Sequence, residues 1–206
     1  MKIETLVVGQ LATNCYLAIC EETNRTAIID PGDDGEFIVQ KILDLKLKPE
    51  FMAATHGHFD HILAATELKL AFGIPFYLHQ KDLSILKRTR RTAEYFLGIS
   101  VDPPPEVDKF IRGGDVLRFG KEKLAVIETP GHTPGGICLY NQKILFSGDT
   151  LFAEGQVGRT DLGGSSLEDL TNSIKTKLFV LPDETVVYPG HGEETTIKLA
   201  KRERVW

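Results

Sequence analysis

The sequence predicts an α+β fold in which two β-sheets pack against each other and helices cover their outer faces. The first observation is the order of elements, because strand-like runs followed by helical runs occur twice along the chain. The second is the length of 206 residues, for which one domain with one sizeable core is the default. Sheets must bury their apolar faces, so two such groups favour two packed sheets with helices outside. We therefore expect a single domain over residues 1–206.

The composition is typical of a folded protein. Apolar residues make up 42% of the chain and charged residues 26%, which argues against disorder. The formal net charge of −5 leaves no basic footprint, so we expect no nucleic-acid partner. The apolar runs are too short to cross a membrane, and the segment Met1–Thr5 lacks the layout of a signal peptide. A cytoplasmic protein is the resulting expectation, and its oligomeric state is unknown from sequence.

The first half of the chain alternates between strand and helix signals. Alternating and short apolar runs predict strands over residues 2–8, 14–20, 26–29, 51–55 and 74–78. Apolar residues at helical spacing predict helices over residues 36–47, 62–72 and 81–97. The turn Asp30–Asp33 precedes the first helix, Pro49 marks its end, and Gly73 ends the second helix.

The second half follows a rigid connector at Pro103–Pro105. A hairpin around Gly120 is predicted from the strand-like runs 115–119 and 123–128. Further strands are predicted over residues 136–140, 143–147 and 185–188. Helical periodicity predicts the last two helices over residues 166–179 and 194–204.

Two sets of side chains allow structural interpretations. Three cysteines, an odd number, lie in apolar strand-like runs, and we interpret them as small core residues: Cys15, Cys20 and Cys138. The helix predicted over residues 81–97 carries a basic face made of Lys87, Arg88, Arg90 and Arg91. That face is either a solvated helix surface or the border of a site for an anionic substrate.

The segment Thr55–His61 holds three of the six histidines and one aspartate. Imidazole and carboxylate groups are ligands of divalent transition metals. In an extended segment, side chains two residues apart share a face, so His56 and His58 can point at one ion. A turn at Asp60 and His61 can aim both of these at a second ion. The structural alternative is a histidine-rich surface loop.

The other histidines favour the metal-site hypothesis. Four predicted strands each end in a loop with ligand-type residues, and these loops together use five of the six histidines. The additional candidate ligands are His132, Asp149 and His191. His79 has no such setting, and we interpret it as an ordinary structural or surface histidine.

The number of candidate ligands fits two ions better than one. The first ion would be held by His56, His58 and His132. The second would be held by Asp60, His61 and His191. Asp149 can bridge the two ions, since a carboxylate has two oxygens. Three protein ligands with an open position are typical of catalytic sites, and no cysteine lies next to these residues.

Two adjacent ions indicate hydrolytic chemistry. At a separation of about 3.5 Å they can share a hydroxide, lower its pKa towards about 7 and polarise the carbonyl or phosphoryl group that it attacks. Asp60 can also orient the bridging water or accept its proton. Asp30 is either a partner of a ligating imidazole or an ordinary turn-capping aspartate. Zinc is the expected metal, and iron and manganese also accept nitrogen and oxygen ligands.

Together these motifs resemble those of the metallo-β-lactamase superfamily. They are Ile29-Asp30-Pro31-Gly32, Thr55–His61, Pro130-Gly131-His132-Thr133, Ser147-Gly148-Asp149-Thr150 and Pro189-Gly190-His191. They span most of the chain and occur in the order found in that superfamily. The resemblance implies an αββα sandwich, that is, two mixed β-sheets flanked by helices, with two metals at one edge of the sheets.

Within the superfamily the chain is most similar to the hydroxyacylglutathione hydrolase (glyoxalase II) group. The resemblance includes Gly158-Arg159-Thr160-Asp161, found in short bacterial members and in persulfide dioxygenases. Asp149 stands where the main zinc class of β-lactamases carries a cysteine, which disfavours antibiotic hydrolysis. The pattern His-x-His-x-Asp-His disfavours flavo-diiron proteins, and the lack of an RNA-processing insertion disfavours a nuclease. The implied substrate is a small thioester such as S-lactoylglutathione.

The chain departs from full-length glyoxalase II after its last histidine. Those enzymes have a C-terminal helical domain that supplies much of the glutathione site, whereas 15 residues follow His191 here. The tyrosine usual shortly after that histidine is also missing. We therefore expect no glutathione-binding helical domain. Arg159 is the candidate for holding a substrate carboxylate through paired hydrogen bonds, and a salt bridge to Asp161 is the structural alternative.

Three functions remain open at this point. The first is a dinuclear metal hydrolase acting on a small thioester. The second is a mononuclear iron dioxygenase acting on a persulfide, which needs only His56, His132 and Asp149. The third is a non-catalytic metal-binding module, although nothing in the sequence indicates a dedicated partner surface.

Overall fold

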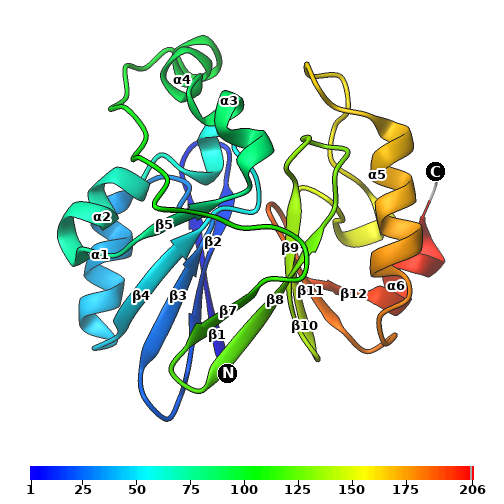
Figure 1. The fold of residues 1–206 in the computed structure, drawn as a ribbon, viewed down its shortest axis with the longest axis horizontal. Coiled ribbons are helices and arrows are strands. Elements are labelled where there is room, and N and C mark those ends of the chain that lie inside the picture. The colour runs from blue at the N-terminus through cyan, green and yellow to red at the C-terminus, as the bar shows by residue number, and fades with distance from the viewer. Residues whose placement is uncertain (205) are drawn as a thin grey trace.

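Two six-stranded sheets form the centre of the computed structural model, which describes residues 1–204 and 206 (Figure 1). The first sheet has the spatial order β1 (Lys2–Val8), β2 (Thr13–Ile19), β3 (Arg25–Ile29), β4 (Lys48–Ala53), β5 (Phe76–Leu78) and β6 (Lys109–Phe110). The second has the order β12 (Thr195–Thr196), β11 (Val186–Pro189), β10 (Ile144–Gly148), β9 (Ile137–Asn141), β8 (Glu122–Glu128) and β7 (Val116–Phe119). Each half of the chain therefore forms its own sheet.

Both sheets are mixed, as expected. In the first sheet β1, β2 and β3 pair antiparallel, and β3 to β6 pair in parallel. In the second sheet β7 to β10 pair antiparallel, β10 and β11 pair in parallel, and β12 pairs antiparallel with β11. Strands β8, β10 and β11 consequently run in the same direction, so the loops that follow them leave the same edge of the sheet.

Helices cover the outer faces of the sheets and complete four layers (Figure 1). The first sheet is covered by α1 (Gly35–Asp44) and α2 (Ala65–Phe72), and the second by α5 (Leu167–Ser173) and α6 (Ile197–Glu203). Alternation in β2 serves two cores at once: Tyr16 packs between the sheets, and Leu17 packs under the helices. The predicted two-sheet architecture with outer helices is confirmed.

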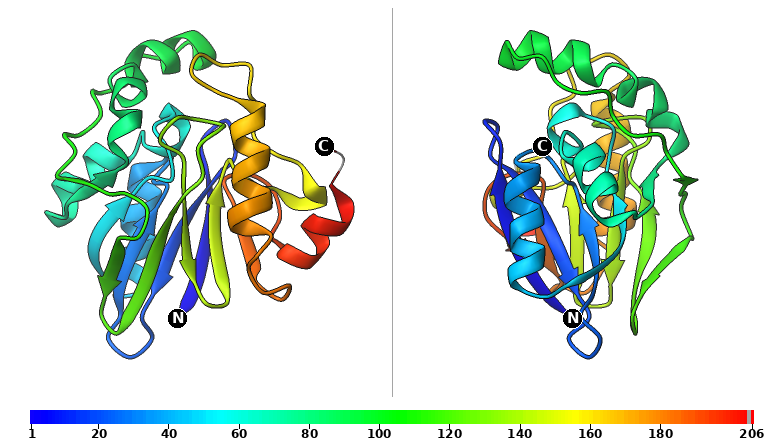
Figure 2. Two further views of the ribbon diagram at one scale, coloured as in Figure 1. Left: turned by 45° about the vertical axis from the view of Figure 1, so that its right-hand side comes forward. Right: turned by 90° about the vertical axis from the view of Figure 1, so that its left-hand side faces the viewer.

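Two short helices, α3 (Leu83–Leu86) and α4 (Thr89–Leu97), lie across one end of the sandwich, away from the N-terminus (Figure 2). The single helix predicted over residues 81–97 is therefore wrong. A 3₁₀ turn at Gln80–Asp82 comes first, and the chain breaks again at Lys87–Arg88. The hydroxyl of Thr89 donates to the Leu86 carbonyl at 2.7 Å, a side-chain bond of the kind that competes with helix continuation.

The helix predicted over residues 36–47 is three residues too long. It ends at Asp44, and Lys46 adopts a left-handed φ of 52°. Pro49 lies inside β4 and does not mark the helix end. The pairing of β3 and β4 shifts register between Thr26 and Ala27, and such an irregularity accommodates a proline that cannot donate to the ladder.

The other elements are close to the predicted ones. The helix predicted over 194–204 begins only at Ile197, because Thr195 and Thr196 pair with β11. The Thr196 hydroxyl then accepts from Leu199 N at 3.2 Å and caps α6. The helix predicted over 62–72 begins at Ala65, and the one over 166–179 continues beyond Ser173 as a π-helical turn. Strand β6 was not predicted, since two paired residues leave no periodicity to detect.

The three cysteines are buried and form no disulfide, as predicted for core residues.

None of the helices in residues 1–204 combines the length and hydrophobicity needed to span a membrane.

Candidate metal centre

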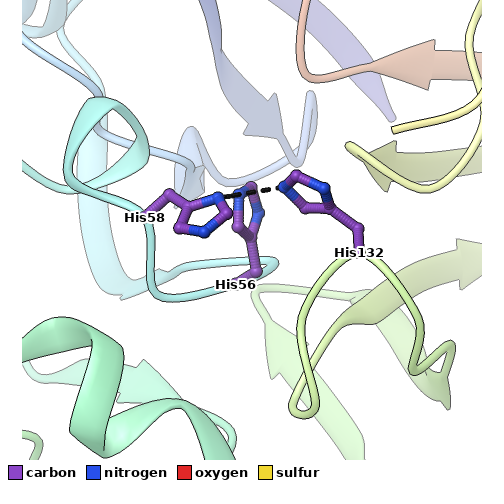
Figure 3. A group of neighbouring side chains, drawn as sticks. All are labelled: His56, His58 and His132. Atoms are coloured by element: carbon purple, nitrogen blue, oxygen red, sulfur yellow. Dashed lines mark hydrogen bonds between the residues drawn. The ribbon is translucent and has the colours of Figure 1, made fainter. Parts of the chain in front are cut away.

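Three histidines from two halves of the chain meet beyond the ends of β4 and β8. His56 Nε2 and His132 Nε2 lie 3.1 Å and 3.0 Å from His58 Nδ1. Figure 3 shows the three rings converging from two separate loops. Tetrahedral zinc with bonds of 2.0–2.1 Å separates its ligand atoms by about 3.3 Å. The three nitrogens are therefore spaced for one ion.

A second group of ligands lies beside the first. His191 Nε2 is 3.4 Å and His61 Nε2 is 3.7 Å from Asp60 Oδ2. Asp149 lies between the groups, with Oδ2 3.5 Å from His132 Nε2 and Oδ1 3.4 Å from His61 Nε2. One carboxylate oxygen faces each group. The arrangement fits two adjacent divalent ions, with Asp149 in a bridging position.

Unpaired buried atoms support the fit of this cluster to metal ions. Both ring nitrogens of His61 and Oδ1 of Asp149 are buried without a hydrogen-bond partner among the described residues. Such atoms are rare in folded proteins, because leaving water without a replacement partner costs free energy. A divalent cation would satisfy His61 Nε2 and Asp149 Oδ1 together.

Outer contacts aim the imidazoles inward. His132 Nδ1 donates to the carbonyl of Arg159 at 2.8 Å, and His191 Nδ1 donates to the carbonyl of Leu11 at 3.0 Å. The Thr55 hydroxyl lies 3.1 Å from His56 Nδ1. In each case the outer nitrogen is engaged and Nε2 is left free as a ligand.

Asp30 lies directly behind this cluster and contacts two of its segments. Its carboxylate accepts hydrogen bonds from Thr55 N at 2.6 Å and from the Thr55 hydroxyl at 2.8 Å. Its Oδ2 is also 3.0 Å from His61 Nδ1, although the approach does not have the direction of a hydrogen bond. The residue adopts a left-handed φ of 51°, a conformation that aspartate tolerates better than most side chains. Asp30 thus adjoins a candidate ligand, as the first of its two interpretations requires.

The protonation of the two groups differs. Burial lowers the pKa of His56 and brings that of His58 to about 4, so both rings are neutral at pH 7. Burial also acts to lower the pKa of His61, but the surrounding carboxylates, Asp149 foremost, raise it above its ordinary value. Burial acts to raise the pKa of Asp149, and His61 overcomes it, so that carboxyl remains ionised. The second group is therefore a site that attracts positive charge.

Glycines allow the loops to pack this closely. A Cβ at Gly190 would overlap Asp149 Oδ1 and lie 2.7 Å from His61 Cε1. Gly148 has a φ of 49°, and a Cβ there would overlap the Thr55 hydroxyl. The strand-end glycines are thus part of what holds the ligands in place.

An open cavity of about 540 Å³ adjoins the ligands. Its apolar walls come from Leu11, Phe59, Ile85, Phe96, Phe152 and Leu162. Two arginines also line it: Arg159, which pairs with Asp161 through two 2.7 Å hydrogen bonds, and Arg88, for which the described residues offer no ion-pair partner. The salt bridge that was the structural alternative for Arg159 is present. The guanidinium of Arg159 also borders the cavity.

Sequence reasoning missed several supporting groups. Leu11 and Arg159 act through backbone carbonyls, which carry no side-chain signal. His79 lies outside the cluster, buried and 3.2 Å from Glu128, which agrees with its structural interpretation. The basic face on α3 and α4 is divided, since Arg88 alone of its four residues borders the cavity.

Comparison with known proteins identifies the family. The model of the metallo-beta-lactamase superfamily matches residues 8–191. An uncharacterised protein of Aquifex aeolicus is 41% identical over 96% of this chain and 92% of its own length. The probable metallo-hydrolase YqgX of Bacillus subtilis is 39% identical, covering 96% of this chain and 93% of the relative. The hydroxyacylglutathione hydrolase GloC of Haemophilus influenzae is 36% identical, covering 98% and 96%.

Solved structures agree in fold. The B3 metallo-β-lactamase BLEG-1 superposes with a TM-score of 0.91 at 33% identity, covering 98% of this chain and 97% of its own. TTHA1623 in a di-iron-bound form superposes with a TM-score of 0.88 at 35% identity, covering 98% of both chains.

The glycine contacts lead to a first prediction. Gly190→Ala should lower metal affinity at least about tenfold, because the added methyl group displaces Asp149 from its bridging position. Gly163→Ala is the matched control, since its Cβ would meet no atom within 4 Å. Elemental analysis after dialysis against a competing chelator measures the metal that each variant retains. Wild-type retention in Gly190→Ala would contradict a contribution of Asp149 to metal binding.

The unpaired buried atoms lead to a second prediction. Chelation of the metal should lower the melting temperature by about 5–10 °C, because ligand at a hundredfold excess over Kd stabilises a fold by about 2.7 kcal/mol. Differential scanning calorimetry with and without chelator measures the shift, and added zinc should reverse it. An unchanged melting temperature would contradict metal binding at this cluster.

Proposed function

The chain belongs to the metallo-β-lactamase superfamily, and from that premise we propose that it is a dinuclear metal hydrolase acting on a small thioester such as S-lactoylglutathione. The observation that carries the proposal is the position of Asp149 between two groups of ligands on the floor of an open cavity. The name of the relative GloC, a hydroxyacylglutathione hydrolase, supports the choice of thioester.

The cluster supports hydrolysis through the groups that face the cavity. When bound, two divalent ions would supply a hydroxide nucleophile at neutral pH and polarise the thioester carbonyl. Asp60 borders the cavity, and its side chain is 15% exposed. Burial acts to raise the pKa of Asp60, but His61 and His191 lower it below its ordinary value. A carboxylate held ionised in this way is a weak base, so Asp60 orients the attacking water more than it stores the proton.

The metal is proposed to be zinc or iron. All the candidate ligand atoms are nitrogen or carboxylate oxygen, which both metals accept. The di-iron form of TTHA1623 supports iron as an occupant of such a site.

The cavity supports an anionic thioester. Its apolar walls suit the acyl group and the carbon chain next to sulfur. Arg88 and Arg159 suit carboxylates, with which guanidinium forms paired charge-assisted hydrogen bonds. S-lactoylglutathione carries two carboxylates. Arg159 would exchange Asp161 for a substrate carboxylate, whereas Arg88 has no ion-pair partner to release among the described residues.

Two other activities remain candidates for specific reasons. A mononuclear iron dioxygenase would use His56, His132 and Asp149, which lie together in the cluster. It would not need the other four candidate ligands, which converge equally well. Asp149 disfavours a β-lactam by comparison with the main zinc class of β-lactamases, but the name of BLEG-1, a B3 metallo-β-lactamase, supports testing a β-lactam as a further substrate. Opening its amide also begins with attack on a carbonyl. A non-catalytic module would show metal binding without any turnover.

A third prediction separates hydrolase from dioxygenase. His58→Ala and Asp60→Ala should each lower thioester kcat/KM by more than about a hundredfold, since each removes a ligand from a different ion. Arg90→Ala, exposed and outside the cavity lining, should not affect turnover. Thioester, β-lactam and persulfide turnover are measured on all three variants, with metal content recorded in parallel. Thioesterase activity retained in both ligand variants would refute the dinuclear mechanism.

A fourth prediction concerns the arginine on the cavity wall. Arg88→Ala should raise KM for an anionic thioester roughly three- to tenfold, because a partly solvated charged hydrogen bond is lost. KM for an uncharged thioester should stay the same. Arg90→Ala, exposed and outside the cavity lining, is the matched control. Equal effects on both substrates would exclude Arg88 from anion recognition.

A further inference from the structure

A buried carboxylate outside the candidate ligands joins the two loops that hold the histidine triad. Asp82 Oδ2 accepts hydrogen bonds from Gly57 N at 2.9 Å and from the Thr133 hydroxyl at 2.7 Å. Its Oδ1 accepts from Gly135 N at 2.6 Å. Gly57 lies between His56 and His58, and Thr133 follows His132. One side chain therefore binds next to all three members of the triad.

The carboxylate is placed where a charge is unfavourable. Asp82 is fully buried, and no cation forms an ion pair with it within the described part of the chain. Burial raises the pKa of this carboxyl, and the hydrogen bonds from Thr133, Gly57 and Gly135 act in the opposite direction. A buried charge without a cationic partner costs folding free energy. The hydrogen bonds from these three donors instead hold the two loops against one carboxylate, which constrains the distance between the loops.

Close packing makes the connection rigid. A Cβ at Gly57 would lie 2.9 Å from the Asp82 carbonyl oxygen, and a Cβ at Gly135 would lie 2.7 Å from Asp82 Oδ1. Both loops thus approach Asp82 so closely that only glycine fits without displacement. A small shift of Asp82 would be transmitted to both loops.

The three donors come from segments that are far apart in sequence. Gly57 precedes Asp82 by 25 residues, and Gly135 follows it by 53. The first loop leaves the first sheet and the second loop leaves the second sheet. A nearby contact, His79 to Glu128 at 3.2 Å, also joins the two halves but touches neither loop. Two neighbouring contacts thus join the halves of the chain, and of these only the hydrogen bonds of Asp82 reach the loops that carry the triad.

We propose that Asp82 is a positioning residue that sets the separation between His132 and the pair His56 and His58, and thereby the affinity of the three-histidine ion site. The inference concerns metal binding and holds whether or not a thioester is the substrate. It distinguishes the two ion sites, because the donors to the Asp82 carboxylate among the described residues lie in the loops that carry the triad, and none is adjacent in sequence to Asp60, His61, Asp149 or His191.

Asp82→Asn is the informative change. It keeps the size of the side chain but turns one acceptor oxygen into a donor, which must face Gly135 N–H or the pair formed by Gly57 N–H and the Thr133 hydroxyl. The loops should move apart at that contact. Thr133→Val is a milder change, since it removes one of the three hydrogen bonds and leaves both amides paired.

The experiment measures zinc affinity of each site separately by competition with a chromophoric chelator. In a His191→Ala background, which keeps the triad, Asp82→Asn should weaken zinc binding about 10- to 100-fold. In a His132→Ala background, which keeps the other site, Asp82→Asn should change zinc affinity by less than about threefold. Cobalt substitution in the first background should show altered visible absorption bands. Thermal unfolding of the metal-free variants checks that the fold is retained.

Two controls decide between positioning and general support. Glu128→Ala breaks the link between His79 and Glu128 but keeps the His79 side chain, which caps the turn that carries Asp82. It should leave both zinc affinities unchanged; a loss matching that of Asp82→Asn would overturn the proposal. Equal weakening of both sites by Asp82→Asn, or weakening of neither, would also overturn it. If Asp82→Asn fails to fold, Thr133→Val replaces it, with an expected loss of about threefold or more confined to the triad. Unchanged triad affinity in that variant would be a negative result for the proposal.

Discussion

Candidate ligand atoms from loops of two separate sheets must lie within 4.8 Å of one another in each group, and the rest of the structure serves this constraint. The mixed topology brings the carboxyl ends of β8, β10 and β11 to one edge, where they meet the end of β4. Backbone bonds then join the halves beside the site, from Ile137 N to Thr55 O at 2.9 Å and from Asn14 N to Gly190 O at 2.8 Å. Backbone hydrogen bonds thus link the two sheets directly beside the candidate ligands.

Charge and burial oppose each other in the cluster. Burial keeps His56 and His58 neutral, whereas three carboxylates draw positive charge towards His61. Without a cation, both ring nitrogens of His61 and Oδ1 of Asp149 find no hydrogen-bond partner among the described residues. A divalent ion would offset the charge of the carboxylates and would coordinate His61 Nε2 and Asp149 Oδ1. Metal binding and the stability of this end of the fold are therefore physically coupled.

The candidate ligands and the cavity wall come from different layers of the molecule. The candidate ligands project from strand ends of the two sheets, which the hydrophobic cores hold rigidly. The cavity wall comes partly from α3 and α4, which lie outside the sandwich and supply Ile85, Arg88 and Phe96. Changes on α4 would alter the cavity wall, whereas α3 begins directly after Asp82 and Ile85 packs against Gly57, so changes on α3 would also reach the histidine loops.

The sequence by itself determined the two-sheet architecture and nominated seven ligands that the structure brings together. Both rest on local signals: strand periodicity is read within a few residues, and histidine and aspartate are chemically specific wherever they occur. Tertiary structure alone decided that the carbonyl of Leu11 lies behind His191 and that Asp82 binds both histidine loops. Each depends on a contact between segments remote in sequence, as between Leu11 and His191, which are 180 residues apart. No periodicity or composition encodes such a pairing, because it exists only once the two sheets have packed.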